Sequence, residues 1–152
     1  MYLLFKIVGI LFILISSFLF GYTKSVFFKK RVSELKKISA GTLRLKEQVA
    51  NCPCEIESIY HSCYGSCNDL EYKNGKIIAK EGSLSKEDSE LLNEFFHSLG
   101  ALDINSECAR INLYSELIKK QITCAETDAE QGSKIWQTCS VCVGIGISIL
   151  II

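Results

Sequence analysis

The sequence predicts an all-α protein, in which an antiparallel helical bundle is flanked by an N-terminal and a C-terminal transmembrane helix. Apolar residues are concentrated at both ends of the 152-residue chain, and between the ends they recur every three or four positions, the period of a helix. The chain contains a single proline, which disfavours a turn-rich sheet protein. We expect a transmembrane helix at residues 2–22, one helical domain at residues 23–134 and a second transmembrane helix at residues 135–152.

The N-terminal apolar segment, Tyr2–Tyr22, has one charged residue, Lys6, near its start. As a helix it would be about 31 Å long, which matches the ~30 Å hydrocarbon core of a bilayer. The alternative is a cleaved signal peptide. The apolar run is too long for a signal core, however, and no small-x-small cleavage site follows Phe20. We therefore expect an uncleaved anchor.

The C-terminal apolar segment, Ile135–Ile152, carries no charge and would span about 27 Å as a helix, which is just enough to cross a bilayer. Trp136 stands near its start and Lys134 just outside it, an arrangement typical of the headgroup level. Gly144 and Gly146 permit close contacts between membrane helices. The alternative is a buried terminal helix of a water-soluble core.

Basic residues follow the first apolar segment. Six Lys and Arg residues lie from Lys24 to Lys37, whereas only Lys6 precedes them. By the positive-inside rule, this asymmetry places the middle domain in the cytoplasm and both chain ends outside. The eight cysteines of the chain are consistent with this orientation, because thiols stay reduced in the cytoplasm and need not form disulfides. The basic stripe is interpreted as a topology signal and a lipid contact, and not as a nucleic-acid site, because no aromatic-rich binding module accompanies it.

The first part of the middle domain, residues 24–49, is expected to form one helix with an apolar face. Pro53 breaks this pattern and suits the first turn of a new, short helix, which we place from Glu55 to about His61. Residues 63–82 contain glycines, asparagines and scattered lysines and are interpreted mostly as a loop. The apolar face consists of Val32, Leu35, Ile38, Thr42, Leu45 and Val49.

The clearest local signal is at Ser85, which is followed three residues later by Asp88 in the manner of a capping box. The helix that begins there has a wide apolar stripe and ends at Gly100, a residue that accepts positive φ. Asp103 is well placed to cap the last helix, whose stripe has the spacing of a packing seam. The earlier helix must fold back against this seam. The stripes are Leu91, Leu92, Phe95, Phe96 and Leu99, then Ile104, Cys108, Ile111, Ser115, Ile118, Ile122, Ala125 and Ala129.

No pattern in the sequence indicates catalysis or nucleotide binding. The chain lacks a phosphate-binding glycine loop and a G-x-S-x-G elbow. Its two histidines, His61 and His97, are interpreted as surface or boundary residues. We therefore expect no enzyme activity, no cofactor and no small-molecule substrate.

One cluster of cysteines is a candidate metal site. Four thiolates can bind zinc tetrahedrally, but C-x-C followed by C-x-x-x-C is not one of the tight paired knuckles. The alternative is that these are small, semi-buried residues of a cytoplasmic protein. If they do bind metal, the chain is a small membrane-tethered, cysteine-rich zinc or thiol protein. Cys139 and Cys142 are interpreted as packing residues. The candidate ligands are Cys52, Cys54, Cys63 and Cys67.

Three stretches of the chain carry a resemblance to a known family. Gly21-Tyr22 closes the first apolar segment and RVSELKKISAGTLRLKEQVA follows it as a basic helix. The stretch LSKEDSELLNEFFHSLGALD is a leucine-rich helix that runs into Leu99, Gly100 and Asp103. In this order they resemble the stage III sporulation protein AB family of endospore-forming Firmicutes, over nearly the whole chain.

The resemblance implies a function that composition does not supply. Members of that family are membrane components of the channel or secretion-like complex that links mother cell and forespore, in the mother-cell membrane around the forespore. Their cytoplasmic domain is similar to that of F-type secretion platform proteins. The implied partners are the cytoplasmic ATPase of the complex, stage III sporulation protein AA, the other membrane subunits and membrane lipid. The bundle would pass the motion of the ATPase to the membrane helices.

Overall fold

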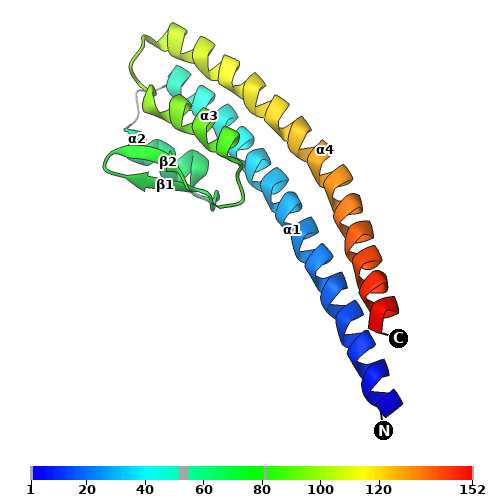
Figure 1. The fold of residues 1–152 in the computed structure, drawn as a ribbon. Coiled ribbons are helices and arrows are strands. Elements are labelled where there is room, and N and C mark those ends of the chain that lie inside the picture. The colour runs from blue at the N-terminus through cyan, green and yellow to red at the C-terminus, as the bar shows by residue number, and fades with distance from the viewer. Residues whose placement is uncertain (1, 52–54, 81, 152) are drawn as a thin grey trace. The chain divides into compact units, whose positions relative to one another are not determined.

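Along the chain, two short helical segments, a small sheet and a third helix lie between two long helices (Figure 1). The structure is a computed structural model that describes residues 2–51, 55–80 and 82–151. Contacts divide the chain into a paired-helix unit, residues 1–29 and 126–152, and a hairpin unit, residues 30–125. The elements are α1 (Tyr2–Asn51), α2 (Ile56–Ile59), a π-helical turn (Tyr60–Tyr64), β1 (Leu70–Lys73), β2 (Lys76–Ala79), α3 (Lys86–His97) and α4 (Ile104–Ile151).

The hairpin of β1 and β2 corrects the all-α prediction, because it lies in the stretch interpreted as a loop. The strands pair antiparallel, with Leu70 opposite Ala79 and Tyr72 opposite Ile77. The turn between them is Asn74-Gly75, in which both residues have positive φ, 53° and 77°. That geometry belongs to the tight hairpin turns for which Asn-Gly is preferred. The protein is therefore mostly helical with one two-stranded sheet among the described residues.

The short helix expected at residues 55–61 is also different in the structure. Regular helix ends at Ile59, and a π-helical turn continues to Tyr64. This extension turns Cys63 and Tyr64 into the interior, where both are buried. The phenol of Tyr64 hydrogen-bonds the hydroxyl of Thr42 on α1 at 3.1 Å. The π-helical turn thus packs directly against α1.

The core of the hairpin unit is formed mostly by the faces that helical spacing predicts, although Ile104, the first residue of the predicted stripe on α4, is exposed. Phe95 lies centrally, with its ring centroid 5.0 Å from those of both Phe96 and Tyr114. Phe96 in turn meets Tyr64 edge to face at 5.2 Å. Burial of these side chains supplies most of the driving force for folding of the unit. The buried helical residues include Leu35, Ile38 and Leu45 of α1, Leu92, Phe95 and Phe96 of α3, and Ile111, Tyr114, Ile118 and Ala125 of α4.

The helix ends around α3 follow the predicted capping pattern. Ser85 Oγ accepts a hydrogen bond from the Asp88 backbone N–H at 3.1 Å, and Asp88 Oδ2 accepts one from the Ser85 backbone N–H at 3.0 Å. Gly100 has φ of 82°, as expected for a residue that ends a helix. Asp103 Oδ2 accepts a hydrogen bond from the Ser106 backbone N–H at 3.3 Å, which caps α4. These bonds satisfy amide groups that a bare helix terminus leaves without partners.

The paired-helix unit consists of the first part of α1 and the last part of α4. Ser25 pairs with Ser133, Phe20 with Trp136, and Ser17 with Ser140. Across these three contacts the residue numbers on α1 decrease while those on α4 increase, so the two helices are antiparallel. Within the parts of the chain that the structure describes, none of the helices combines the length and the apolar character that a membrane crossing requires. The transmembrane helices at residues 2–22 and 135–152 stay predictions.

Replacing Gly41 with alanine is expected to destabilise the hairpin unit. The new Cβ would lie 2.6 Å from the carbonyl oxygen of Cys63 and 2.7 Å from the ring of Tyr64, which is well inside van der Waals contact. Alanine favours a helix by up to about 1 kcal/mol, so a net loss of roughly 1–3 kcal/mol would show that the clash dominates. The measurement is the midpoint of urea unfolding of the full chain. Ser33→Ala, an exposed position on the same helix, is the control and should change stability by less than about 0.5 kcal/mol. An unchanged midpoint for Gly41→Ala would contradict the close approach.

Candidate functional site

A buried ion pair joins α1 to the start of α3. Arg31 Nε lies 2.7 Å from Asp88 Oδ2, and Arg31 Nη2 lies 3.1 Å from Asp88 Oδ1. The side chain of Asp88 is 0% exposed and that of Arg31 is 13% exposed. Burial by itself would raise the pKa of Asp88, but the hydrogen bonds from Arg31 and Ser85 outweigh it and lower the pKa below its usual value. One carboxylate therefore both caps α3 and fixes it to α1.

A second carboxylate, Glu34, joins α1 to the segment before β1. It accepts hydrogen bonds from Lys37 Nζ at 2.7 Å, from the backbone N–H of Asn68 at 2.8 Å and from Asn68 Nδ2 at 3.0 Å. Burial opposes ionisation, yet the bonds from Lys37 and Asn68 together lower the pKa of Glu34. In the sequence, Glu34 is the single acidic residue among the basic residues from Lys24 to Lys46. Lys37 is a local partner, three residues further along α1, but nothing in the local sequence indicates Asn68, which is distant along the chain.

Arg110 joins α4 to the end of α3. Its Nη1 donates to the carbonyl oxygen of Phe95 at 3.1 Å and to the hydroxyl of Ser98. Its guanidinium lies 5.5 Å from the ring centroid of Phe95, within the range of a cation–π contact. Glu107, one turn earlier on α4, pairs with the other end of the guanidinium and accepts a hydrogen bond from the Gly100 backbone N–H at 3.4 Å. Asp88, Glu34 and Arg110 thus each connect two structural elements of the hairpin unit.

A seam of small residues lies between the helices of the paired-helix unit. On α1, Ser17, Gly21 and Ser25 recur every four positions, and Gly21 and Ser25 are buried. The Oγ atoms of Ser25 and Ser133 are 2.6 Å apart, and Ser17 Oγ donates to the backbone carbonyl of Ser140. Small residues four apart let helix backbones approach closely. Sequence reasoning missed this seam on α1, although its four-residue spacing is visible in the printed sequence.

On α4, the two glycines singled out from the sequence differ in burial. Gly144 is buried in the paired-helix unit. Gly146 is exposed, and a Cβ added there would have no described heavy atom within 4 Å. Gly146 therefore makes no close contact among the described residues.

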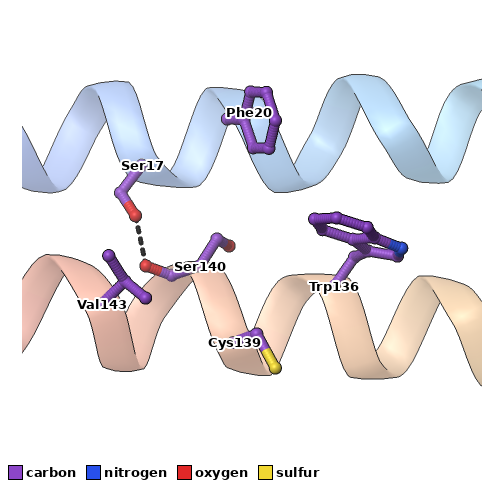
Figure 2. A pocket seen from close by; sticks show the side chains of 6 residues that line it. All are labelled: Ser17, Phe20, Trp136, Cys139, Ser140 and Val143. Atoms are coloured by element: carbon purple, nitrogen blue, oxygen red, sulfur yellow. Dashed lines mark hydrogen bonds between the residues drawn. The ribbon is translucent and has the colours of Figure 1, made fainter.

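A groove opens beside this seam (Figure 2). It has a volume of about 230 Å³. Phe20 and Trp136 stand at one end, with ring centroids 6.2 Å apart, and the ammonium of Lys24 lies 5.9 Å from the centroid of the Trp136 ring. The groove is lined by Ser17, Phe20, Trp136, Cys139, Ser140 and Val143. Cys139, which the sequence predicts as a packing residue, thus lines the groove.

The candidate zinc ligands are only partly described by the structure. Cys52 and Cys54 lie outside the described residues. Cys63 and Cys67 are both buried, and the thiol of Cys63 lies 3.3 Å from Gln48 Oε1. Burial raises the pKa of Cys67 to about 11, so this thiol is protonated at neutral pH. No group of three or more possible metal ligands occurs among the residues described.

These features define a class of protein that combines a unit of two antiparallel helices with a mostly helical unit that contains a β-hairpin. Its charged side chains join structural elements. A family model of stage III sporulation protein AB matches residues 72–152. The match covers more than half of the chain, and the chain therefore belongs to this family. It includes Leu99, Gly100 and Asp103, the residues on which the resemblance in sequence was strongest. No curated protein and no solved structure matches the chain.

Replacing Asp88 with alanine is expected to cost roughly 3–5 kcal/mol, because it leaves the Arg31 guanidinium without this carboxylate and removes one of the two hydrogen bonds of the capping box, the one from the Ser85 backbone N–H. The folded-state pKa of Asp88 is below its unfolded value of about 3.9. Its stabilising effect is therefore complete above that value and is lost as the pH falls through the folded-state pKa. Urea unfolding of the full chain from pH 7 to pH 3 measures this.

The comparison uses Glu87→Ala, an exposed acid in the same first turn of α3. It should cost less than about 1 kcal/mol at every pH. A difference in unfolding free energy between wild type and Asp88→Ala that does not shrink below about pH 4 would be inconsistent with an ionised, paired Asp88.

Proposed function

We propose that this protein is a structural membrane component of the channel or secretion-like complex between mother cell and forespore, and that it couples a cytoplasmic ATPase to the membrane assembly. Membership in the stage III sporulation protein AB family, which gives a role in stage III sporulation, is the observation that carries the proposal. The proposed partner is the ATPase of the same system, stage III sporulation protein AA. The hairpin unit would bind it from the cytoplasm.

The apolar segments at both ends of the chain support a membrane location. In the paired-helix unit, many large apolar side chains are exposed. Contiguous apolar surface of this kind marks a contact with lipid or protein. No acidic residue precedes Glu34 or follows Glu130, so no carboxylate would enter the bilayer. The exposed side chains include Val8, Leu11, Phe12, Ile15, Phe18, Leu19, Phe20, Val141, Val143, Ile145, Ile147 and Ile149.

The continuity of the two long helices supports mechanical coupling. α1 and α4 each contribute residues to both units without a break in the helix. A continuous helix offers no loop in which a displacement could be absorbed. Leu113 and Leu117, one turn apart on α4, are exposed apolar side chains of the hairpin unit. They are the first positions at which we would test contact with the ATPase.

The chain's own cysteines test the membrane location and the orientation. Cys124, Cys139 and Cys142 are all exposed in the structure, so differences in their labelling would come from the membrane. A membrane-impermeant maleimide should leave all three unlabelled in intact cells and should label Cys124 after the membrane is permeabilised. Cys139 and Cys142 should react far more slowly than Cys124 until detergent is added. Equal reaction of all three in permeabilised membranes would contradict insertion, and labelling of Cys124 in intact cells would contradict the orientation.

Removal of the gene tests the role in sporulation, and binding of the ATPase tests the coupling. Deletion should reduce heat-resistant spores by orders of magnitude and stop development after engulfment, and the wild-type gene should restore both. The purified full chain should bind the ATPase. Leu113→Ser together with Leu117→Ser should weaken this binding while the unfolding midpoint stays unchanged. Leu43→Ser, an exposed apolar position on α1, is the control. Normal sporulation of the deletion strain would end the proposal.

A further inference from the structure

The groove of the paired-helix unit has the chemistry of a lipid site. We propose that it holds part of an acyl chain of an anionic phospholipid, whose phosphate lies beside Lys24. This inference rests on the proposed membrane location and adds a specific ligand to it. The ordinary contact of a membrane helix with bulk lipid requires neither a groove nor a charge preference.

The walls of the groove suit a hydrocarbon chain. Phe20, Cys139 and Val143 present apolar surface, and the Ser17 hydroxyl is engaged by the backbone carbonyl of Ser140 across the seam. The volume of about 230 Å³ is below the ~300–1,000 Å³ of pockets that enclose drug-sized ligands. The groove is therefore too small for a bulky molecule, whereas a slender chain can enter it for part of its length and continue into the bilayer. Figure 2 shows the two helices that form its sides.

The charge beside the groove favours an anionic headgroup. Lys24 follows Ser17 and Phe20 by steps of seven and four, so it lies on the same face of α1. Its ammonium lies over Trp136, a side chain typical of the headgroup level. Lys134, next to the Ser25–Ser133 pair on α4, stands at the same level. The nearest acidic residue in the sequence of either helix is Glu130, so the phosphate of an anionic lipid would meet positive potential.

The same charge argues against a second copy of this chain as the occupant. A symmetric contact places the same surface on both subunits. Two copies that pack through the groove in the same membrane orientation would place two Lys24 ammoniums at the same level of one interface, with no acidic residue closer in the sequence of either helix than Glu130, and their repulsion is unfavourable. A lipid satisfies the apolar groove and the lysine with one molecule.

The fluorescence of Trp136, the only tryptophan of the chain, reports directly on the groove. The full chain is reconstituted into vesicles in which the mole fraction of phospholipid brominated on its acyl chains is varied, because bromine quenches nearby tryptophan. Brominated phosphatidylglycerol should quench at about fivefold lower mole fraction than brominated phosphatidylcholine, the factor that one lysine contributes beside an anionic membrane surface. Lys24→Gln should abolish the difference. Lys29→Gln, an exposed lysine of the same unit outside the groove, should keep it.

Filling the groove provides an independent variant. Cys139→Phe should reduce quenching by both lipids, whereas Val141→Phe, at an exposed position that does not line the groove, should leave it unchanged. Equal quenching by the two lipids in the wild type, or unchanged quenching in Cys139→Phe, would overturn the lipid site while the membrane location stands. Absence of quenching by either lipid in a monomer would overturn the membrane location itself. Absence of quenching in a dimer that Cys139→Phe disrupts would assign the groove to a second copy and overturn the proposal.

Discussion

The carboxylate of Asp88 is the contact on which the arrangement of the hairpin unit depends most. It accepts the backbone N–H of Ser85 and pairs with Arg31 through both oxygens. A buried carboxylate without a partner would be strongly destabilising, whereas a paired and hydrogen-bonded one fixes a geometry. The start of α3 can therefore lie at only one place along α1. That placement brings Phe95 and Phe96 into the core.

The charged contacts also connect the two halves of the chain that the family comparison treats differently. The matched part begins at Tyr72 and contains β2, α3 and α4. Arg31 and Glu34 lie before it, yet they bind Asp88 inside it and Asn68 just ahead of it. The middle of α1 is thus built into the same unit as residues 72–125 of the matched part. Its basic side chains serve the fold as well as the charge asymmetry of the sequence.

Local signals in the sequence predicted the helices and their ends well, because caps and apolar stripes depend on neighbouring residues. The capping residues Ser85 and Asp103 needed no knowledge of the rest of the chain. The sequence-based prediction missed the β-hairpin because it gave the polar composition of residues 63–82 more weight than their alternating pattern. Asn74-Gly75 between alternating buried residues is a hairpin signal, but the lysines and glycines around it were taken as a loop. The contacts of Glu34 with Asn68 and of Ser25 with Ser133 join residues that are distant along the chain, which a single sequence does not bring together.

The seam has a consequence for the order of assembly. The Ser25–Ser133 contact joins residues 108 positions apart, and closing so large a flexible loop costs considerable chain entropy. The contacts of the hairpin with α3 are closer in sequence and form sooner. Once the intervening unit has folded, little flexible chain remains between the two helical arms. During synthesis, the first part of α1 is therefore made before the end of α4 with which it pairs. The seam of serines and glycines between these two helices closes last.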